Sequence, residues 1–192
     1  LTVVSDLLSE AGFANINFEN EYALSSDGGR AVFVISDSGG SYEREIISWD
    51  IPTNEFSSIG SINSSSGSGL TLSGDGEYAF FTAQASTFVP GVNGEQLIRY
   101  ELLTGASEIV SSNEDGGAVG KGMDVDVSGD GRFAVFRSDN TSGFDFESYV
   151  SGNSHGWVLK DMQTGNVSRV ANSYDGGALN DQVTNASISD DG

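Results

Sequence analysis

One short pattern recurs along the chain and restricts what it can fold into: a serine, an Asp-Gly turn and then an apolar run. The clearest copy is residues 128–136 (SGDGRFAVF), and related copies occupy residues 72–81 and 24–33. Residues 188–192 begin a fourth copy. Asp-Gly between apolar runs predicts a tight turn between two strands, because glycine adopts positive φ without a Cβ clash. The chain is therefore expected to repeat one turn-and-strand unit.

The residues on the two sides of this turn differ in pattern. Residues 133–136 (FAVF) are apolar at every position, which predicts a strand with both faces covered. Residues 123–127 (MDVDV) alternate, which predicts a partner strand with one wetter face. The unit is therefore expected to pack between two neighbours rather than to lie on a surface.

The spacing of the copies indicates the architecture. The aligned turn residues Asp27, Asp75, Asp130 and Asp191 are separated by steps of 48, 55 and 61 residues. A period near ~50 residues with about four strands per unit is typical of β-propeller blades. Two further strands are expected in each unit, joined by a turn with an acid, Thr and then Gly or Asn, as in residues 161–165.

These patterns predict an all-β fold of about three propeller blades, each a four-stranded antiparallel sheet, with partial flanking strands. Residues 1–20 are expected to be the tail of a preceding blade and a connector, with a short strand at residues 2–4. The predicted blades cover residues 21–69, 70–122 and 123–183, and residues 184–192 begin a further blade.

Three segments carry a resemblance to a known family. Residues 127–139, 157–165 and 188–192 resemble the repeat of the TolB-like, WD-repeat-like β-propellers of bacterial secreted and envelope proteins. Residues 88–94 resemble the loop that commonly precedes the third strand in that family, whereas Pro52 and Asn54 depart from its pattern. The resemblance covers nearly the whole chain. It implies a propeller fold, a binding role, a secreted, periplasmic or cell-surface location, and no shared catalytic residues.

Composition excludes several classes of function. Glycine contributes 26 of 192 residues and proline only 2, which fits many short strands joined by glycine-rich turns. The formal charge of −20 disfavours nucleic acid and anionic membranes as partners, because their phosphates would be repelled. The absence of cysteine excludes disulfides and thiolate chemistry. No apolar run is long enough for a membrane span.

Three blades cannot close a ring, since closed propellers typically have 4–8 blades. An open arc is expected to leave an apolar face bare at each end, larger than the few hundred Å² that a monomer normally exposes. We therefore expect more of the same chain, another copy, or a different subunit to complete the ring.

Aspartates are the candidate metal ligands in this sequence. Asp126 and Asp130 occupy positions one and five of a sequence that begins like a calcium loop, but its twelfth residue is Arg137 instead of Glu. Asp139 and Asp145 are further calcium candidates on loops. Aspartates of the recurring turn are expected mainly to hold hairpins. His155 is the only histidine, which excludes a multi-histidine metal site.

No nucleophile elbow or phosphate-binding loop is present, so no catalytic or cofactor residue is predicted. Trp49, Tyr100 and Trp157 could stack on sugars, but strand aromatics in blades more often pack between sheets. The preferred hypothesis is a non-catalytic scaffold that binds a protein or glycan. Two alternatives stay open: the substrate-gating propeller of a larger hydrolase, such as a prolyl-oligopeptidase-type peptidase, and a calcium-stabilised subunit of a surface assembly.

Overall fold

The computed structural model describes residues 4–13, 15–37, 44–62, 69–144, 156–170 and 185–192. In this part of the chain, three four-stranded antiparallel sheets follow one another, which confirms the predicted all-β fold of partial propeller blades. Within each sheet the strands lie in chain order, as in a meander. We number the sheets as blades one to three.

The strands have the following bounds. Blade one contains β1 (Ile16–Leu24), β2 (Arg30–Asp37), β3 (Arg44–Asp50) and β4 (Glu55–Ile62). Blade two contains β5 (Thr71–Leu72), β6 (Tyr78–Gln84), β7 (Glu95–Glu101) and β8 (Ser107–Ile109). Blade three contains β9 (Gly122–Val127), β10 (Phe133–Ser138), β11 (Gly156–Asp161) and β12 (Val167–Arg169). Two short 3-10 helices, η1 (Ala85–Thr87) and η2 (Thr141–Phe144), lie between strands.

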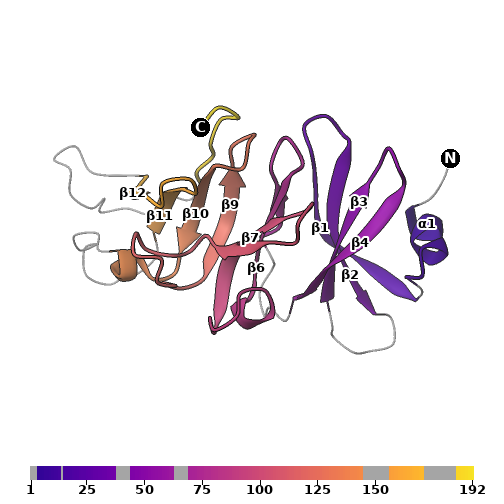
Figure 1. Ribbon diagram of the computed structural model, residues 1–192, viewed down its shortest axis with the longest axis horizontal. Helices are drawn as coiled ribbons and strands as arrows, with labels where there is room; N and C mark the ends of the chain where they lie inside the picture. Colours follow the sequence, from indigo (N-terminus) through magenta and orange to yellow (C-terminus); the bar gives the residue numbers. More distant parts are fainter. Residues whose placement is uncertain (1–3, 14, 38–43, 63–68, 145–155, 171–184) are drawn as a thin grey trace.

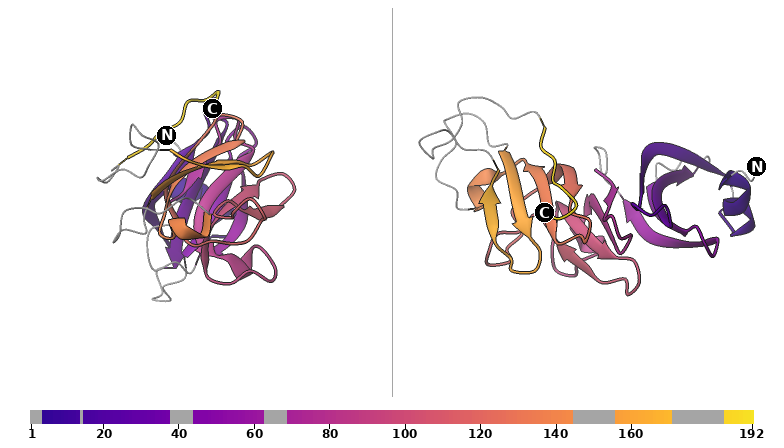
Figure 2. Two further views of the ribbon diagram at one scale, coloured as in Figure 1. Left: turned by 90° about the vertical axis from the view of Figure 1, so that its left-hand side faces the viewer. Right: turned by 90° about the horizontal axis from the view of Figure 1, so that it is seen from above.

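The blades stand side by side in chain order along the long axis of the molecule (Figure 1). The first strands contact one another, β1 with β5 and β5 with β9, so the first strand of each blade forms the inner edge of the arc. The view from above shows the same succession of separate sheets (Figure 2), and the buried apolar residues form three separate clusters in the described residues.

Apolar side chains fill the space between successive blades. We call the face of a blade that looks toward the preceding blade its rear face. Ala79 and Phe81 of β6 lie on the rear face of blade two and pack in one cluster with Val32 and Val34 of blade one. The equivalent pair of blade three packs against blade two: Ala134 and Phe136 share a cluster with Phe80 and Leu97. The repeated sequence positions therefore make equivalent contacts.

The N-terminal segment differs from the prediction. We expected a strand at residues 2–4 and a connector up to residue 20, but Val4–Glu10 forms a helix, α1, and β1 already begins at Ile16. Gly12 follows the end of the helix and has a φ of 98°. Its N–H donates to Ser9 O, and the Phe13 N–H donates to Leu8 O. These two bonds form a Schellman motif, which satisfies carbonyls at the end of a helix. The prediction of a connector was wrong where α1 and β1 form, whereas residues 2 and 3 of the predicted strand lie outside the described residues.

Helix α1 packs on the rear face of blade one. Leu8 is fully buried and forms a cluster with Phe33, Ile35 and Ile47, which occupy the positions that face a preceding blade elsewhere in the chain. The expectation of a bare apolar face at this end is therefore only partly correct, because α1 covers the middle of it. No helix in the described residues is long and apolar enough to cross a membrane.

Candidate functional site

The recurring turn has the same geometry in all three blades. Its serine hydroxyl donates to the aspartate Oδ1, at 2.6 Å in Ser25–Asp27 and Ser73–Asp75 and at 2.7 Å in Ser128–Asp130. The same serine oxygen accepts the N–H of the first residue after the turn, at 2.9 Å in each blade. The turn is therefore closed by side chains as well as by the backbone.

The start of the predicted fourth copy adopts this geometry too. The Ser189 hydroxyl donates to Asp191 Oδ1 at 2.7 Å, and the Gly192 N–H donates to Ser189 O at 2.9 Å. Gly192 has a φ of 79°, close to the 65° of the equivalent Gly131. We call the four turns together the turn row; it consists of residues 25–30, 73–78, 128–133 and 189–192.

Backbone hydrogen bonds join each member of the turn row to the next. The Ser26 N–H donates to Gly74 O at 2.8 Å, and the Asp75 N–H donates to Gly129 O at 2.9 Å. The Gly129 N–H donates in turn to Asp190 O at 2.9 Å. In the described residues no β-ladder joins one blade to the next, so these hydrogen bonds of the turn row help to set the relative placement of the blades.

Close packing explains why the turns require glycine. A Cβ on Gly131 would lie 2.8 Å from Tyr78 Cδ2, and a Cβ on Gly76 would lie 3.2 Å from Arg30 Cβ. In each case the neighbour is the first residue after the turn of the preceding blade. Gly28, which has no preceding turn in the described structure, has nothing within 4 Å of the position that a Cβ would take. The glycine is therefore needed both for positive φ and for blade-to-blade contact.

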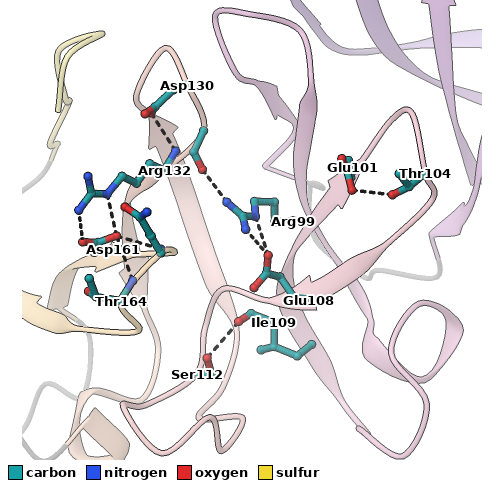
Figure 3. A network of polar contacts seen from close by, with 12 residues as sticks. Arg99, Glu101, Thr104, Glu108, Ile109, Ser112, Asp130, Arg132, Asp161 and Thr164 are labelled. Atoms are coloured by element: carbon teal, nitrogen blue, oxygen red, sulfur yellow. Dashed lines mark hydrogen bonds and ion pairs between the residues drawn. The ribbon is translucent and has the colours of Figure 1, made fainter.

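Ion pairs tie the turn row to the hairpin between the third and fourth strands. Asp161, at the end of β11, accepts hydrogen bonds from Arg132 Nε at 3.0 Å and Nη2 at 2.8 Å (Figure 3). The Arg132 hydrogen bonds hold the pKa of Asp161 well below its usual range. Blade one contains a related pair, Arg30 to Asp50 at 2.8 Å. Hydrogen bonds from Ser128 and from the Arg132 N–H also lower the pKa of Asp130.

Arg99 makes the corresponding connection in blade two. Its Nη1 donates to Gly131 O in the next turn at 3.0 Å, and its guanidinium also pairs with Glu108 (Figure 3). The guanidinium carbon lies 4.6 Å from the centre of the Tyr78 ring, a cation–π contact. One arginine therefore contacts two members of the turn row.

Lys160 forms another connection between blades, and nothing in the sequence pattern indicated it. The side chain is buried, with 4% of its surface exposed, and Nζ donates to Ser112 O at 2.9 Å. Longer contacts at 3.3 Å reach Ser112 Oγ and Asn113 O. Burial lowers the pKa of Lys160, because desolvation disfavours the ammonium ion.

Most of the basic side chains form ion pairs or hydrogen bonds within the molecule. Six of the eight form ion pairs within the described chain, and Lys160 is buried. The pairs are Arg30–Asp50, Arg44–Glu21, Arg99–Glu108, Lys121–Glu95, Arg132–Asp161 and Arg137–Asp124. With 28 acidic residues in the chain, the surface therefore carries a strong excess of negative charge.

The predicted calcium ligands do not come together in the described residues. Asp130 accepts the Ser128 hydroxyl within its own turn. Asp126 accepts the Val127 N–H through Oδ1 and the Ile188 N–H through Oδ2. Asp139 has a buried Oδ1 without a hydrogen-bond partner. No group of three or more acidic or histidine side chains suited to a metal occurs within the described ranges. Asp145 and His155 lie outside them.

The three candidate sugar-stacking aromatics are packed. Trp49 stacks on Phe56, with ring centres 5.4 Å apart and an interplanar angle of 9°. Tyr100 lies edge-on to Phe88 at 6.4 Å. Trp157 is only 3% exposed. Packing between and within blades accounts for all three.

Comparison with solved structures identifies the architecture. TolB from Acinetobacter baumannii matches with a TM-score of 0.52 and 19% identity, over 83% of this chain and 33% of that chain. A putative TolB from Agrobacterium tumefaciens gives the same score and identity, over 83% and 50%. The fold is that of a TolB-like β-propeller. The chain spans one third to one half of the length of these two proteins.

A third similar structure is an enzyme. The acylaminoacyl peptidase of Pyrococcus horikoshii matches with a TM-score of 0.50 and 13% identity, over 79% of this chain and 24% of that chain. No protein-family model matches the sequence, and neither does any curated protein. At these identities the similarity concerns the fold, so the function has to be argued from the side chains.

The described arrangement is suited to holding surfaces in fixed positions. The turn row joins successive blades, Arg99 and Lys160 join blades two and three, and Asp130 is hydrogen-bonded within its own turn. The sequence indicated the turn row through its repeated Ser-x-Asp-Gly. It gave no signal for Lys160 or Arg99, because their partners lie in a different blade.

Proposed function

We propose that this chain is a non-catalytic binding module of a secreted or envelope-associated bacterial β-propeller protein, and that it presents a rigid surface to a protein or glycan partner. The observation that carries the proposal is the turn row, in which successive turns are joined by backbone hydrogen bonds of 2.8–2.9 Å. Such bonds resist relative movement of the blades and so keep a binding surface pre-organised, which lowers the entropic cost of association.

The chemistry of the side chains supports a binding role. The basic residues neutralise acids within the molecule, and the remaining negative charge repels nucleic acid and anionic lipid surfaces. A partner with a neutral or cationic surface fits this charge. The similarity to TolB supports a periplasmic or secreted setting for the same fold.

Parallel binding and turnover assays on the purified chain test the proposal. Arrays of bacterial surface glycans and of envelope-protein peptides should reveal saturable binding to one class, while peptide and ester substrates should stay uncleaved. Turnover that exceeds the buffer rate and is retained through purification to homogeneity would contradict the non-catalytic role.

The second candidate is the substrate-gating propeller of a larger hydrolase, such as a prolyl-oligopeptidase-type peptidase. The similarity to an acylaminoacyl peptidase, of which this chain matches 24%, favours it. In this case the parent polypeptide should carry an α/β-hydrolase domain with a nucleophile elbow. Removing the propeller should then widen the range of peptide lengths that the parent enzyme cleaves, whereas a scaffold protein would show no peptidase activity to alter.

A further inference from the structure

Asn93 and Gly94 end the loop that joins β6 to β7 in blade two. Both residues are exposed, and β7 begins at the next residue, Glu95. Gly94 has a φ of 83°, and in the described chain the nearest atom to the position that its Cβ would take is Gln96 Nε2, at 3.9 Å. Within the described residues, the Asn93 side chain has no hydrogen-bond partner. The side-chain amide carbon of Asn93 is therefore accessible to the backbone nitrogen that follows it.

The local backbone explains why the Gly94 N–H is free. The β6–β7 register, extended by one residue, places Ala85 opposite Gly94, and the Ala85 N–H donates to Gly94 O at 2.9 Å. A hydrogen-bonded antiparallel pair normally exchanges two such bonds. Here Ala85 O instead accepts the N–H groups of Phe88 at 2.9 Å and Val89 at 2.7 Å, because η1 begins at Ala85. The Gly94 N–H is thus left without an acceptor in the described residues.

The five Asp-Gly pairs in the described part of the chain differ at this nitrogen. In each of them the glycine N–H donates to the backbone oxygen two residues before the aspartate, at 2.9–3.0 Å. These glycines are Gly28, Gly76, Gly116, Gly131 and Gly192. In the four pairs of the turn row, the aspartate Oδ1 also accepts a serine hydroxyl. The turns therefore engage both the nitrogen and the side chain, whereas Asn93 and Gly94 leave both groups free.

Two free groups of this kind react with each other without an enzyme. The Gly94 nitrogen attacks Asn93 Cγ and forms an N–Cγ bond. The Cγ–Nδ2 bond then breaks, and ammonia leaves with the proton that the Gly94 nitrogen has lost, so a succinimide ring remains. Water opens this ring at either carbonyl and yields aspartate or isoaspartate, which carries one more methylene in the backbone. Glycine favours the attack because it has no Cβ beside the nitrogen.

We propose that Asn93 is a site of spontaneous deamidation in the folded chain, which changes the charge and the backbone at the start of β7. The product places a carboxylate two residues before Glu95, whose Oε2 accepts Lys121 Nζ at 2.9 Å. Isoaspartate lengthens the backbone beside Gly94 and so weakens the hydrogen bond from the Ala85 N–H to Gly94 O. Because the ammonia is lost to solvent, the converted fraction increases with the age of the chain. The reaction does not depend on the binding role proposed above.

Peptide mapping by mass spectrometry, on purified chain incubated in warm, mildly alkaline buffer, tests the proposal. The rate of conversion at Asn93 should rise in proportion to the hydroxide concentration, because the attacking nitrogen must lose its proton. Asn166 is an internal control, since it is exposed but precedes the β-branched Val167. Conversion at Asn166 should be slower by about tenfold or more. Equal rates at the two asparagines would overturn the proposal.

Two variants test the route through the Gly94 nitrogen. Gly94→Ala adds a methyl group beside the attacking nitrogen and should slow conversion about tenfold. Asn93→Gln would have to close a larger ring, so it should stay unconverted over the same period, and both variants should keep the far-UV circular dichroism of the unaltered chain. The unaltered chain should yield isoaspartate together with aspartate at this position. Aspartate alone, or an unchanged rate in Gly94→Ala, would indicate direct hydrolysis and would overturn the proposal.

Incubation in urea tests how far the fold decides which pairs react. Unfolding releases the glycine N–H groups of the turn row, so isoaspartate should appear at Asp75 and Asp130 in urea but not in the folded chain. The rate at Asn93 should change by less than about tenfold on unfolding. A larger increase would show that the folded loop keeps Asn93 and Gly94 from reacting and would overturn the proposal. Isoaspartate at Asp130 of the folded chain would contradict the explanation from the free N–H.

Discussion

Replacing the turn glycine of blade three tests the contact between blades most simply. Gly131 has a φ of 65°, and a Cβ at this position would lie 2.8 Å from Tyr78 Cδ2 and 3.2 Å from Ser73 Cβ. A left-handed conformation costs a non-glycine residue about 1–2 kcal/mol. Overpacking against the preceding blade adds about 1–3 kcal/mol. Gly131→Ala should therefore lower the free energy of unfolding by about 2–5 kcal/mol.

Gly28→Ala is a matched control in the same motif. Gly28 has a φ of 69°, so it carries a similar conformational cost, but nothing lies within 4 Å of its Cβ position. This variant should lose only about 1–2 kcal/mol. Urea unfolding followed by circular dichroism measures both losses, provided that the slope with denaturant stays the same. Equal losses in the two variants would refute the contact between Gly131 and the preceding turn.

Three further predictions concern single side chains. The pKa of Asp161 is lowered in the folded chain, so its ion pair stabilises the fold above the unfolded carboxyl pKa of about 4 and this stabilisation is lost as the pH falls below it. Between about pH 4 and pH 2, the free energy of unfolding of the unaltered chain should therefore fall more steeply than that of Arg132→Gln. Lys160 has a lowered pKa, so the folded chain releases this proton at a lower pH than the unfolded chain does. As the pH rises toward the ordinary lysine pKa of about 10.4, urea unfolding should show the unaltered chain gaining stability relative to Lys160→Met, and parallel curves would contradict this. Leu8 of α1 is fully buried against blade one, so Leu8→Ala should lower the free energy of unfolding in urea by about 2–5 kcal/mol, and a loss near zero would mean that α1 does not pack on blade one.

The sequence predicted the repeated elements of this fold because their signals are local. The serine, aspartate and glycine of the turn lie within four residues of one another, and the apolar run after them needs no distant partner to be recognised. Gly131 could be predicted to have positive φ for the same reason. Its contact with Tyr78 could not, since that contact depends on how far one blade is shifted against the next.

The parts that sequence reasoning missed depend on competition between structures or on distant neighbours. Val4 and Leu8 fit either a strand or one face of a helix, and the Schellman motif at Gly12 decides for the helix. The exposure of Leu24 also had no sequence signal, because its equivalents Leu72 and Val127 are similar in chemistry yet buried. A repeat therefore specifies its strands well but leaves the ends of the arc undetermined.

The central claim is that three equivalent blades are joined through the turn row. Scalar couplings across hydrogen bonds, measured by NMR on isotope-labelled protein, test it directly. The account predicts couplings from the N–H groups of Ser26, Asp75 and Gly129 to the carbonyl carbons of Gly74, Gly129 and Asp190 respectively, where the donor–acceptor distances are 2.8–2.9 Å. Absent couplings and rapid amide exchange at these three positions, in a protein whose β-ladder couplings are intact, would contradict it.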